Sequence, residues 1–166
     1  MKESLRYLCD SFAENCKTFK YDCGFSVLNN HVAAACAFFF AAHKVDVNTE
    51  HVKESAGIIL EHIKGLSYYN TDPLYATTTT FLALNSFPER LLENTIAMFK
   101  VMSKEYSSSS RYAAFAALFL EAMALSEEET DSLLKRSRTI YDCLKGKHLF
   151  LTDSNDIAFV LLLARS

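Results

Sequence analysis

The sequence predicts an all-α fold of four antiparallel helical hairpins, about eight helices, in a single domain over residues 1–166. Three observations predict it. Gly and Pro number only 4 and 2 while half of the residues are hydrophobic, a composition that favours helices. Apolar residues recur at every third or fourth position in several segments, as in amphipathic helices. Other segments are apolar on nearly every side and must be buried on most of their circumference.

The first hairpin is expected to join helices at about residues 3–19 and 25–43. The apolar residues of the first helix form one stripe: Leu5, Cys9, Phe12, Cys16 and Phe19. A turn at 20–24 follows, where Gly24 suits a positive φ. The second helix contains the apolar run VAAACAFFFAA. Its small residues allow another helix to approach closely.

The remaining hairpins follow a period of roughly 40 residues. Asp46, Ser86 and Ser126 are candidate N-caps, each 40 residues after the last, and the two serines open capping boxes with a Glu three residues on. Asn48 is an alternative to Asp46. Each cap precedes an amphipathic helix, the first over Thr49–Leu66. Each amphipathic helix is followed by an apolar one, and these are expected at Pro73–Leu84, Arg111–Leu125 and Ile157–Ala164.

Such a period is typical of stacked helix pairs, in an open helical-repeat array or a compact bundle. We expect the apolar helices inside and the amphipathic helices outside. The chain stops within an apolar helix, at Ala164-Arg165-Ser166, which is typical of a piece truncated at its C-terminus.

The last two hairpins resemble an uncharacterised bacterial family, domain of unknown function four-thousand-three. The resemblance rests on RYAAFAALFL at Arg111–Leu120 and IYDCLKGKHLFLTDSNDIAFVLLLA at Ile140–Ala164, and extends more weakly over most of the chain. The family commonly has Asp-Tyr-Pro where this chain has Asp156-Ile157-Ala158, and its members continue further. The resemblance implies a helical, cytoplasmic bacterial protein and carries no catalytic residue.

Several function classes are disfavoured by the sequence. A net charge of −3 gives no reason to expect nucleic acid as a partner. The longest apolar run, Val32–Ala42, is far shorter than the roughly 20 residues that span a bilayer. Five cysteines without CxxC spacing predict a reduced, cytoplasmic protein. Glu-x-x-His and His-Glu-x-x-His are absent, so no metal site, cofactor or catalytic residue is predicted. Cys23, in a turn, is the cysteine expected to be most exposed.

Two groups of residues remain as candidate sites. The first is a functional surface at one end of the bundle: Arg111, His148, Thr152, Asp153 and Asp156. Its alternative is helix capping with an Arg–Asp surface pair. The second is a pocket among the apolar helices: His31, Thr77 and Thr80. Its alternative is that the threonine hydroxyls bond carbonyl groups one turn back.

The predicted function is a non-enzymatic protein–protein interaction or scaffold module. Its partner would be another protein, or a second copy bound through the C-terminal apolar helix. The competing hypothesis is a small-molecule or metal-ion binding protein, possibly an enzyme, with its pocket between the apolar helices. A buried polar cavity would favour the second hypothesis over the first.

Overall fold

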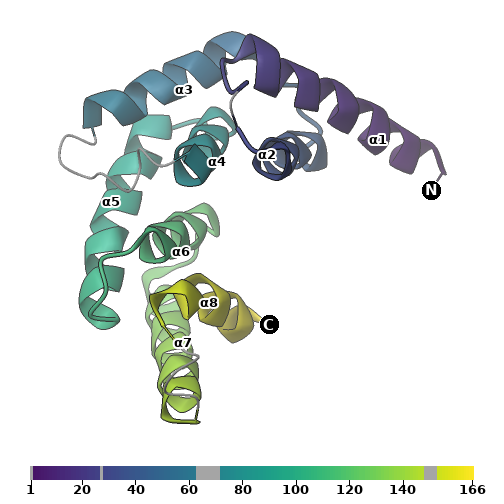
Figure 1. Ribbon diagram of the computed structural model, residues 1–166. Helices are drawn as coiled ribbons and strands as arrows, with labels where there is room; N and C mark the ends of the chain where they lie inside the picture. Colours follow the sequence, from purple (N-terminus) through teal and green to yellow (C-terminus); the bar gives the residue numbers. More distant parts are fainter. Residues whose placement is uncertain (1, 27, 63–71, 148–152) are drawn as a thin grey trace. The chain divides into compact units, whose positions relative to one another are not determined.

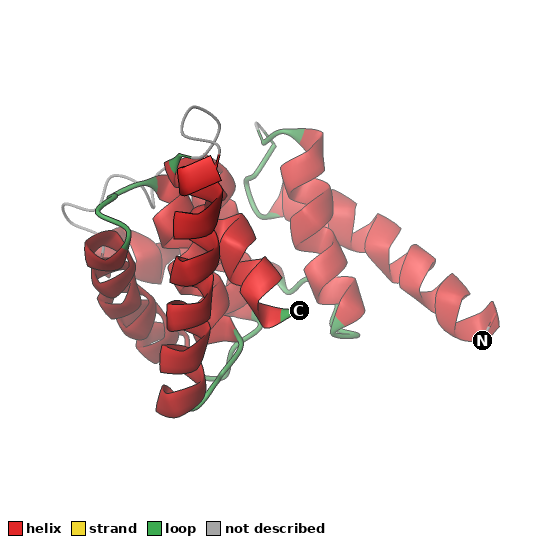
Figure 2. Ribbon diagram, turned by 90° about the horizontal axis from the view of Figure 1, so that it is seen from below, coloured by secondary structure: helices red, strands yellow, loops and turns green. Residues whose placement is uncertain are grey.

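A computed structural model of the chain describes residues 2–26, 28–62, 72–147 and 153–166. These residues form α-helices, one π-helical turn (Thr18–Asp22) and one 3-10 turn (Ser154–Asp156), and none of them forms a strand (Figure 1, Figure 2). The all-α prediction is confirmed. The helices are α1 (Lys2–Lys17), α2 (Asn30–Ala42), α3 (Thr49–His62), α4 (Asp72–Ala83), α5 (Pro88–Glu105), α6 (Arg111–Ala122), α7 (Glu127–Lys147) and α8 (Ile157–Arg165).

The helices gather into two compact units, residues 1–89 and 90–166. In the first unit α1 packs on α2, α3 packs on α4, and α2 packs on α4. In the second unit α8 packs on both α6 and α7. The expectation of one domain over residues 1–166 stays a prediction.

The core of the first unit forms around the buried Phe19 in the π-helical turn. Its ring stacks on Phe25 with centroids 4.6 Å apart and also meets Phe40. The chain reverses between these rings at Gly24, whose φ of +86° is costly for residues with a Cβ. The predicted positive φ is therefore confirmed. Helix α2 begins at Asn30, later than predicted, because the Asn29 side chain accepts a hydrogen bond from the His31 N–H.

The predicted apolar stripe of the first helix is only partly correct. Leu5 and Cys9 are exposed, while the polar residues Ser11 and Asn15 are buried. The reason is a set of hydrogen bonds to the loop after α2. Asn15 Nδ2 donates to the Val45 carbonyl (3.2 Å), and Asn15 Oδ1 accepts from the Val47 N–H (2.9 Å). A buried side-chain amide costs little free energy when its N–H and its C=O group are both hydrogen-bonded. Asn15 can therefore occupy a buried position in place of an apolar residue.

The three predicted caps have different outcomes. Asn48, the alternative to Asp46, caps α3 and accepts from the N–H groups of Glu50 (2.9 Å) and His51 (3.1 Å). The capping box at Ser86 is wrong, because α5 begins later, at Pro88, after a turn in which Asn85 Oδ1 accepts from Phe87 N–H.

The capping box at Ser126 is confirmed. Ser126 N–H donates to Glu129 Oε2 (2.9 Å), and Glu129 N–H donates to Ser126 Oγ (3.3 Å). Both ends of this exchange satisfy backbone donors that the first turn of α7 would otherwise leave free.

Helix α7 is attached to the end of α5 by a polar and aromatic cluster. The buried Tyr106 hydroxyl and the buried Ser137 hydroxyl are 2.6 Å apart, and the Tyr106 ring meets Tyr141 edge-on at 5.1 Å. Arg138 donates to the Glu105 carbonyl at the end of α5, and its Nε also bonds Asp142 at 2.8 Å. These contacts fix α7, on which α8 then packs.

Candidate functional site

Helix α8 presents an apolar face that the described residues of the second unit leave uncovered. Its other side is buried against α6 and α7 through Ile157, Val160, Leu161 and Ala164. Phe159, Leu162 and Leu163 are respectively 58%, 48% and 40% exposed. Their spacing of three and four places them on one side of the helix. We call Phe159, Leu162 and Leu163 the terminal-helix face.

The 3-10 turn that leads into α8 (Ser154–Asp156) is closed by a reciprocal cap. The Asp153 side chain accepts from the Asn155 N–H (2.7 Å), and the Asp153 N–H donates to Asp156 Oδ2 (3.0 Å). The cap places two carboxylates at the N-terminal end of α8, where they also face the positive end of the helix dipole. Arg165 lies at the opposite end of the same helix.

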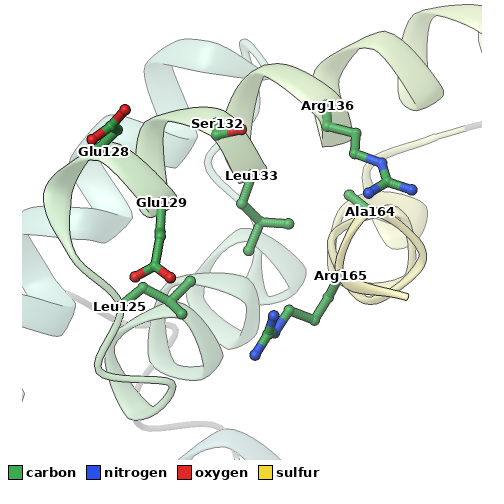
Figure 3. A pocket seen from close by; sticks show the side chains of 8 residues that line it. All are labelled: Leu125, Glu128, Glu129, Ser132, Leu133, Arg136, Ala164 and Arg165. Atoms are coloured by element: carbon green, nitrogen blue, oxygen red, sulfur yellow. The ribbon is translucent and has the colours of Figure 1, made fainter.

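An open pocket of about 350 Å³ lies beside the last turn of α8 and the first turns of α7 (Figure 3). It is lined by Leu125, Glu128, Glu129, Ser132, Leu133, Arg136, Ala164 and Arg165. In Figure 3 the Glu129 carboxylate and the Arg165 guanidinium extend from α7 and α8 at the opening and the Arg136 guanidinium lies near Ala164, whereas the Glu128 carboxylate points away.

The charge of this pocket is partly fixed by the fold. The backbone and side-chain hydrogen bonds from Ser126, aided by the positive charge of Arg165, lower the pKa of Glu129, so this carboxyl stays ionised. Acidic and basic side chains thus line the same pocket. Together they form a polar rim beside the apolar terminal-helix face.

The predicted functional surface is only partly described. His148 and Thr152 lie outside the described residues. Asp153 and Asp156 are brought together by the cap of α8. Arg111 is exposed at the start of α6, with its guanidinium 5.2 Å from the Tyr112 ring centre. The ion pairs within the described ranges are Lys17–Glu14 and Arg138–Asp142, so Arg111 forms none with either aspartate there.

The predicted pocket residues His31, Thr77 and Thr80 lie in different local environments. Thr77 Oγ1 donates to the Pro73 carbonyl (2.7 Å) and Thr80 Oγ1 to the Ala76 carbonyl (2.9 Å), each one turn back on α4. His31 is exposed at the first turn of α2, whereas Thr80 is fully buried. The side chain that faces both threonines is Cys36, and burial raises the pKa of its thiol to about 11.

The cysteine prediction needs one correction. Cys23 is buried, and the exposed cysteines are Cys9 and Cys143. Cys23 lies beside Phe19 and Phe25 in the core of the first unit, which the turn-like sequence around it does not reveal. Burial raises the pKa of the Cys23 thiol despite opposing contributions from Thr49 and Lys53. A buried thiol of raised pKa is a poor nucleophile at neutral pH.

Within the described residues, no group of three or more His, Cys, Asp or Glu side chains is arranged to hold a metal ion. None of the helices in these ranges combines the length and hydrophobicity that crossing a bilayer requires.

Comparison with known families identifies the chain. Residues 15–166 match the model of "Protein of unknown function (DUF4003)". The chain belongs to this family. This confirms the resemblance that the last two hairpins suggested, and the match reaches back into α1. No curated protein and no solved structure matches this DUF4003 chain.

The pocket beside α8 was not predicted for this DUF4003 protein, although part of it has a sequence signal. Glu129 and Arg136 are seven residues apart, two turns along one face of α7. Arg165, from the other helix, comes close only because α8 folds back along α7. The sequence alone does not connect Arg165 with Glu129, because they are 36 residues apart and meet only in the tertiary structure.

Proposed function

We propose that this DUF4003 chain is a non-enzymatic helical interaction module that binds a protein partner through the terminal-helix face. The observation that carries the proposal is the exposure of Phe159, Leu162 and Leu163 on one side of α8. Large exposed apolar side chains that occur singly are normal on protein surfaces. A contiguous group rimmed by polar residues is typical of an interaction site.

The exposed apolar residues outside α8 are dispersed, whereas those on α8 form a contiguous group. The other large hydrophobics that are exposed within the described ranges come from several different elements: Leu5, Tyr7, Tyr21, Phe38, Val45, Leu60, Phe87 and Val101. On α8 three such residues share one helix face. Burying the still exposed part of each would contribute about 1 kcal/mol, since full burial of such a side chain is worth about 1.5–3 kcal/mol.

The pocket beside α8 fits the same proposal. Its charged residues, Glu128, Glu129, Arg136 and Arg165, would form a polar rim next to an apolar centre. This arrangement is common at protein interfaces, where the rim supports specificity. The competing small-molecule hypothesis is less well supported, because Thr77 and Thr80 direct their hydroxyls to carbonyl groups of their own helix.

The proposal includes a helical-repeat organisation and a cytoplasmic location. Helices α3, α5 and α7 begin at Thr49, Pro88 and Glu127, which keeps the spacing of about forty residues typical of stacked helix pairs. All five cysteines are free, as suits a reducing compartment.

Site-specific photo-crosslinking tests the proposed interface. A photoreactive phenylalanine analogue replaces Phe159 in cells that produce the protein, and a matched variant carries it at Lys135, an exposed position on α7. We expect a protein adduct on irradiation of the Phe159 variant, lost when Leu162→Glu is added, and no adduct from position 135. An absent adduct at position 159, or equal adducts at both positions, would contradict the proposal.

A further inference from the structure

Helix α8 exposes a position that is buried at the matching place of α6. The two helices align at an offset of 44 residues, where Ala114-Phe115 matches Ala158-Phe159. At the same offset Leu118 matches Leu162. Leu118 is fully buried in α6, whereas Leu162 is 48% exposed on α8. An apolar residue thus occupies a position of α8 that the described residues of the second unit leave partly exposed.

An apolar helix of similar kind would suit this position of α8. Helix α6 is packed by α8, a short apolar helix of the same pattern. The next layer on α8 would continue this stacking of apolar helix on apolar helix. A second copy of the chain supplies such a helix, namely its own α8.

The charges of α8 decide the direction in which two such helices would pair. Asp153 and Asp156 lie at its N-terminal end, and Arg165 lies at its C-terminal end. Parallel pairing would bring like charges together at both ends. Antiparallel pairing brings the aspartates of one copy to the end that holds Arg165 of the other, and it also opposes the helix dipoles favourably.

We propose that the partner at the terminal-helix face is a second copy of this chain, paired through α8 against α8 in antiparallel orientation about a twofold axis. This rests on the proposed function, whose partner it names. A twofold axis near Leu161 places Phe159 of one copy opposite Leu163 of the other and brings both copies of Leu162 close to the axis.

The pairing is weak. A standard interface buries about 800 Å² on each partner, and three half-exposed side chains supply only part of that area. We therefore expect a dissociation constant in the micromolar range or above, with rapid exchange between monomer and dimer.

Sedimentation equilibrium of the purified full chain tests this proposal, with Leu162→Glu as the variant. Leu60→Glu is the matched control, because Leu60 on α3 is 59% exposed but does not lie on α8. We expect a concentration-dependent dimer for the wild type and the control, and a dimer at least tenfold weaker for Leu162→Glu. Circular dichroism checks that both variants keep their helices. A wild type that stays monomeric, or equal weakening by both variants, would overturn the proposal.

Disulfide trapping tests the geometry independently. In a background where the exposed Cys9 and Cys143 are replaced by Ser, Leu162→Cys should form a covalent dimer on mild oxidation, and Lys135→Cys should not. Equal yields would exclude the twofold arrangement.

The photo-crosslinking adduct separates the two proposals. If the wild type is monomeric but position 159 still crosslinks to a different protein, self-association fails while the interaction module stands.

Discussion

Ala124 holds a backbone conformation that usually belongs to glycine. Its φ is +48°, just after the end of α6, where its N–H donates to the Glu121 carbonyl at 3.1 Å. This left-handed position commonly closes a helix, and a Cβ there costs about 1–2 kcal/mol. The sequence does not mark it, because alanine is also the best residue for continuing a helix.

Ala124→Gly should therefore stabilise the protein. The relief of backbone strain exceeds the extra entropy of glycine in the unfolded chain, for a net gain of about 0.5–1 kcal/mol. Ala122→Gly, two residues earlier and in helical conformation, should instead lose about 0.5–1 kcal/mol. Urea unfolding of both variants measures the difference. A change of the same sign in both would contradict the assignment of strain to Ala124.

Glu121 is a half-buried carboxyl whose charge is poorly accommodated. Burial raises its pKa, and a hydrogen bond with Asn94 opposes this only in part. A carboxyl whose pKa is raised on folding binds its proton more tightly in the folded state. Its protonated form therefore stabilises the folded state fully at pH values below the unfolded pKa, near 4.5. This stabilisation is lost as the pH rises through the folded pKa.

Glu121→Gln should accordingly increase the free energy of unfolding at pH 7 relative to wild type. The gain should shrink as the pH falls towards 4, where the wild-type carboxyl is protonated too. Chemical unfolding at a series of pH values measures it, with Glu61→Gln on the exposed surface of α3 as the control. A gain that is independent of pH would show that the carboxylate charge is not its cause.

At the scale of the helix, identical cap motifs behave differently at the starts of α5 and α7. Ser126 exchanges hydrogen bonds with Glu129 as a capping box requires. Ser86 has the same spacing to Glu89, yet α5 starts at Pro88, after the Asn85 turn. Proline suits the first helical position because its missing N–H would have no partner there.

Ser126→Ala should lower the free energy of unfolding by about 1 kcal/mol, since it removes a cap acceptor. Ser86→Ala should change it by less than about 0.5 kcal/mol, as for an exposed residue outside such a motif. Denaturant titration of the two variants at one pH compares them. Equal losses would mean that Ser86 caps α5 in solution after all.

Helix α8 follows a well-capped turn but is only partly buried. Its reciprocal Asp153–Asp156 cap and its packing on α6 and α7 determine its position. The sequence, apolar on nearly every side, predicts burial all round. The second unit buries only one side of α8 in its described residues, and this difference is the basis of the interaction proposal.

At the scale of the whole molecule, the composition is that of an ordinary globular protein, since half of the residues are hydrophobic. Most of the large hydrophobics that are exposed in the described residues are dispersed, but those of α8 form the terminal-helix face. Self-association through that face would remove these side chains from water without any change in fold.

Much of the fold could be predicted because helix formation depends on local patterns. Scarce Gly and Pro, the apolar periodicity and the Ser126 box all act within a few residues, and the all-α fold followed from them. The positive φ at Gly24 is also a local property, set by the missing Cβ. The candidate sites were harder to predict, because a site depends on residues that are distant in the sequence.

The sequence by itself determined that this protein is helical, where most of its helices lie and to which family it belongs. Only the tertiary structure decided which side of each helix is buried. It placed the polar Asn15 in the interior, because the loop at Val45–Val47 satisfies its amide, and left Leu162 exposed. The physical reason is that burial depends on contacts between distant segments, whereas helix formation depends mainly on neighbours within one turn.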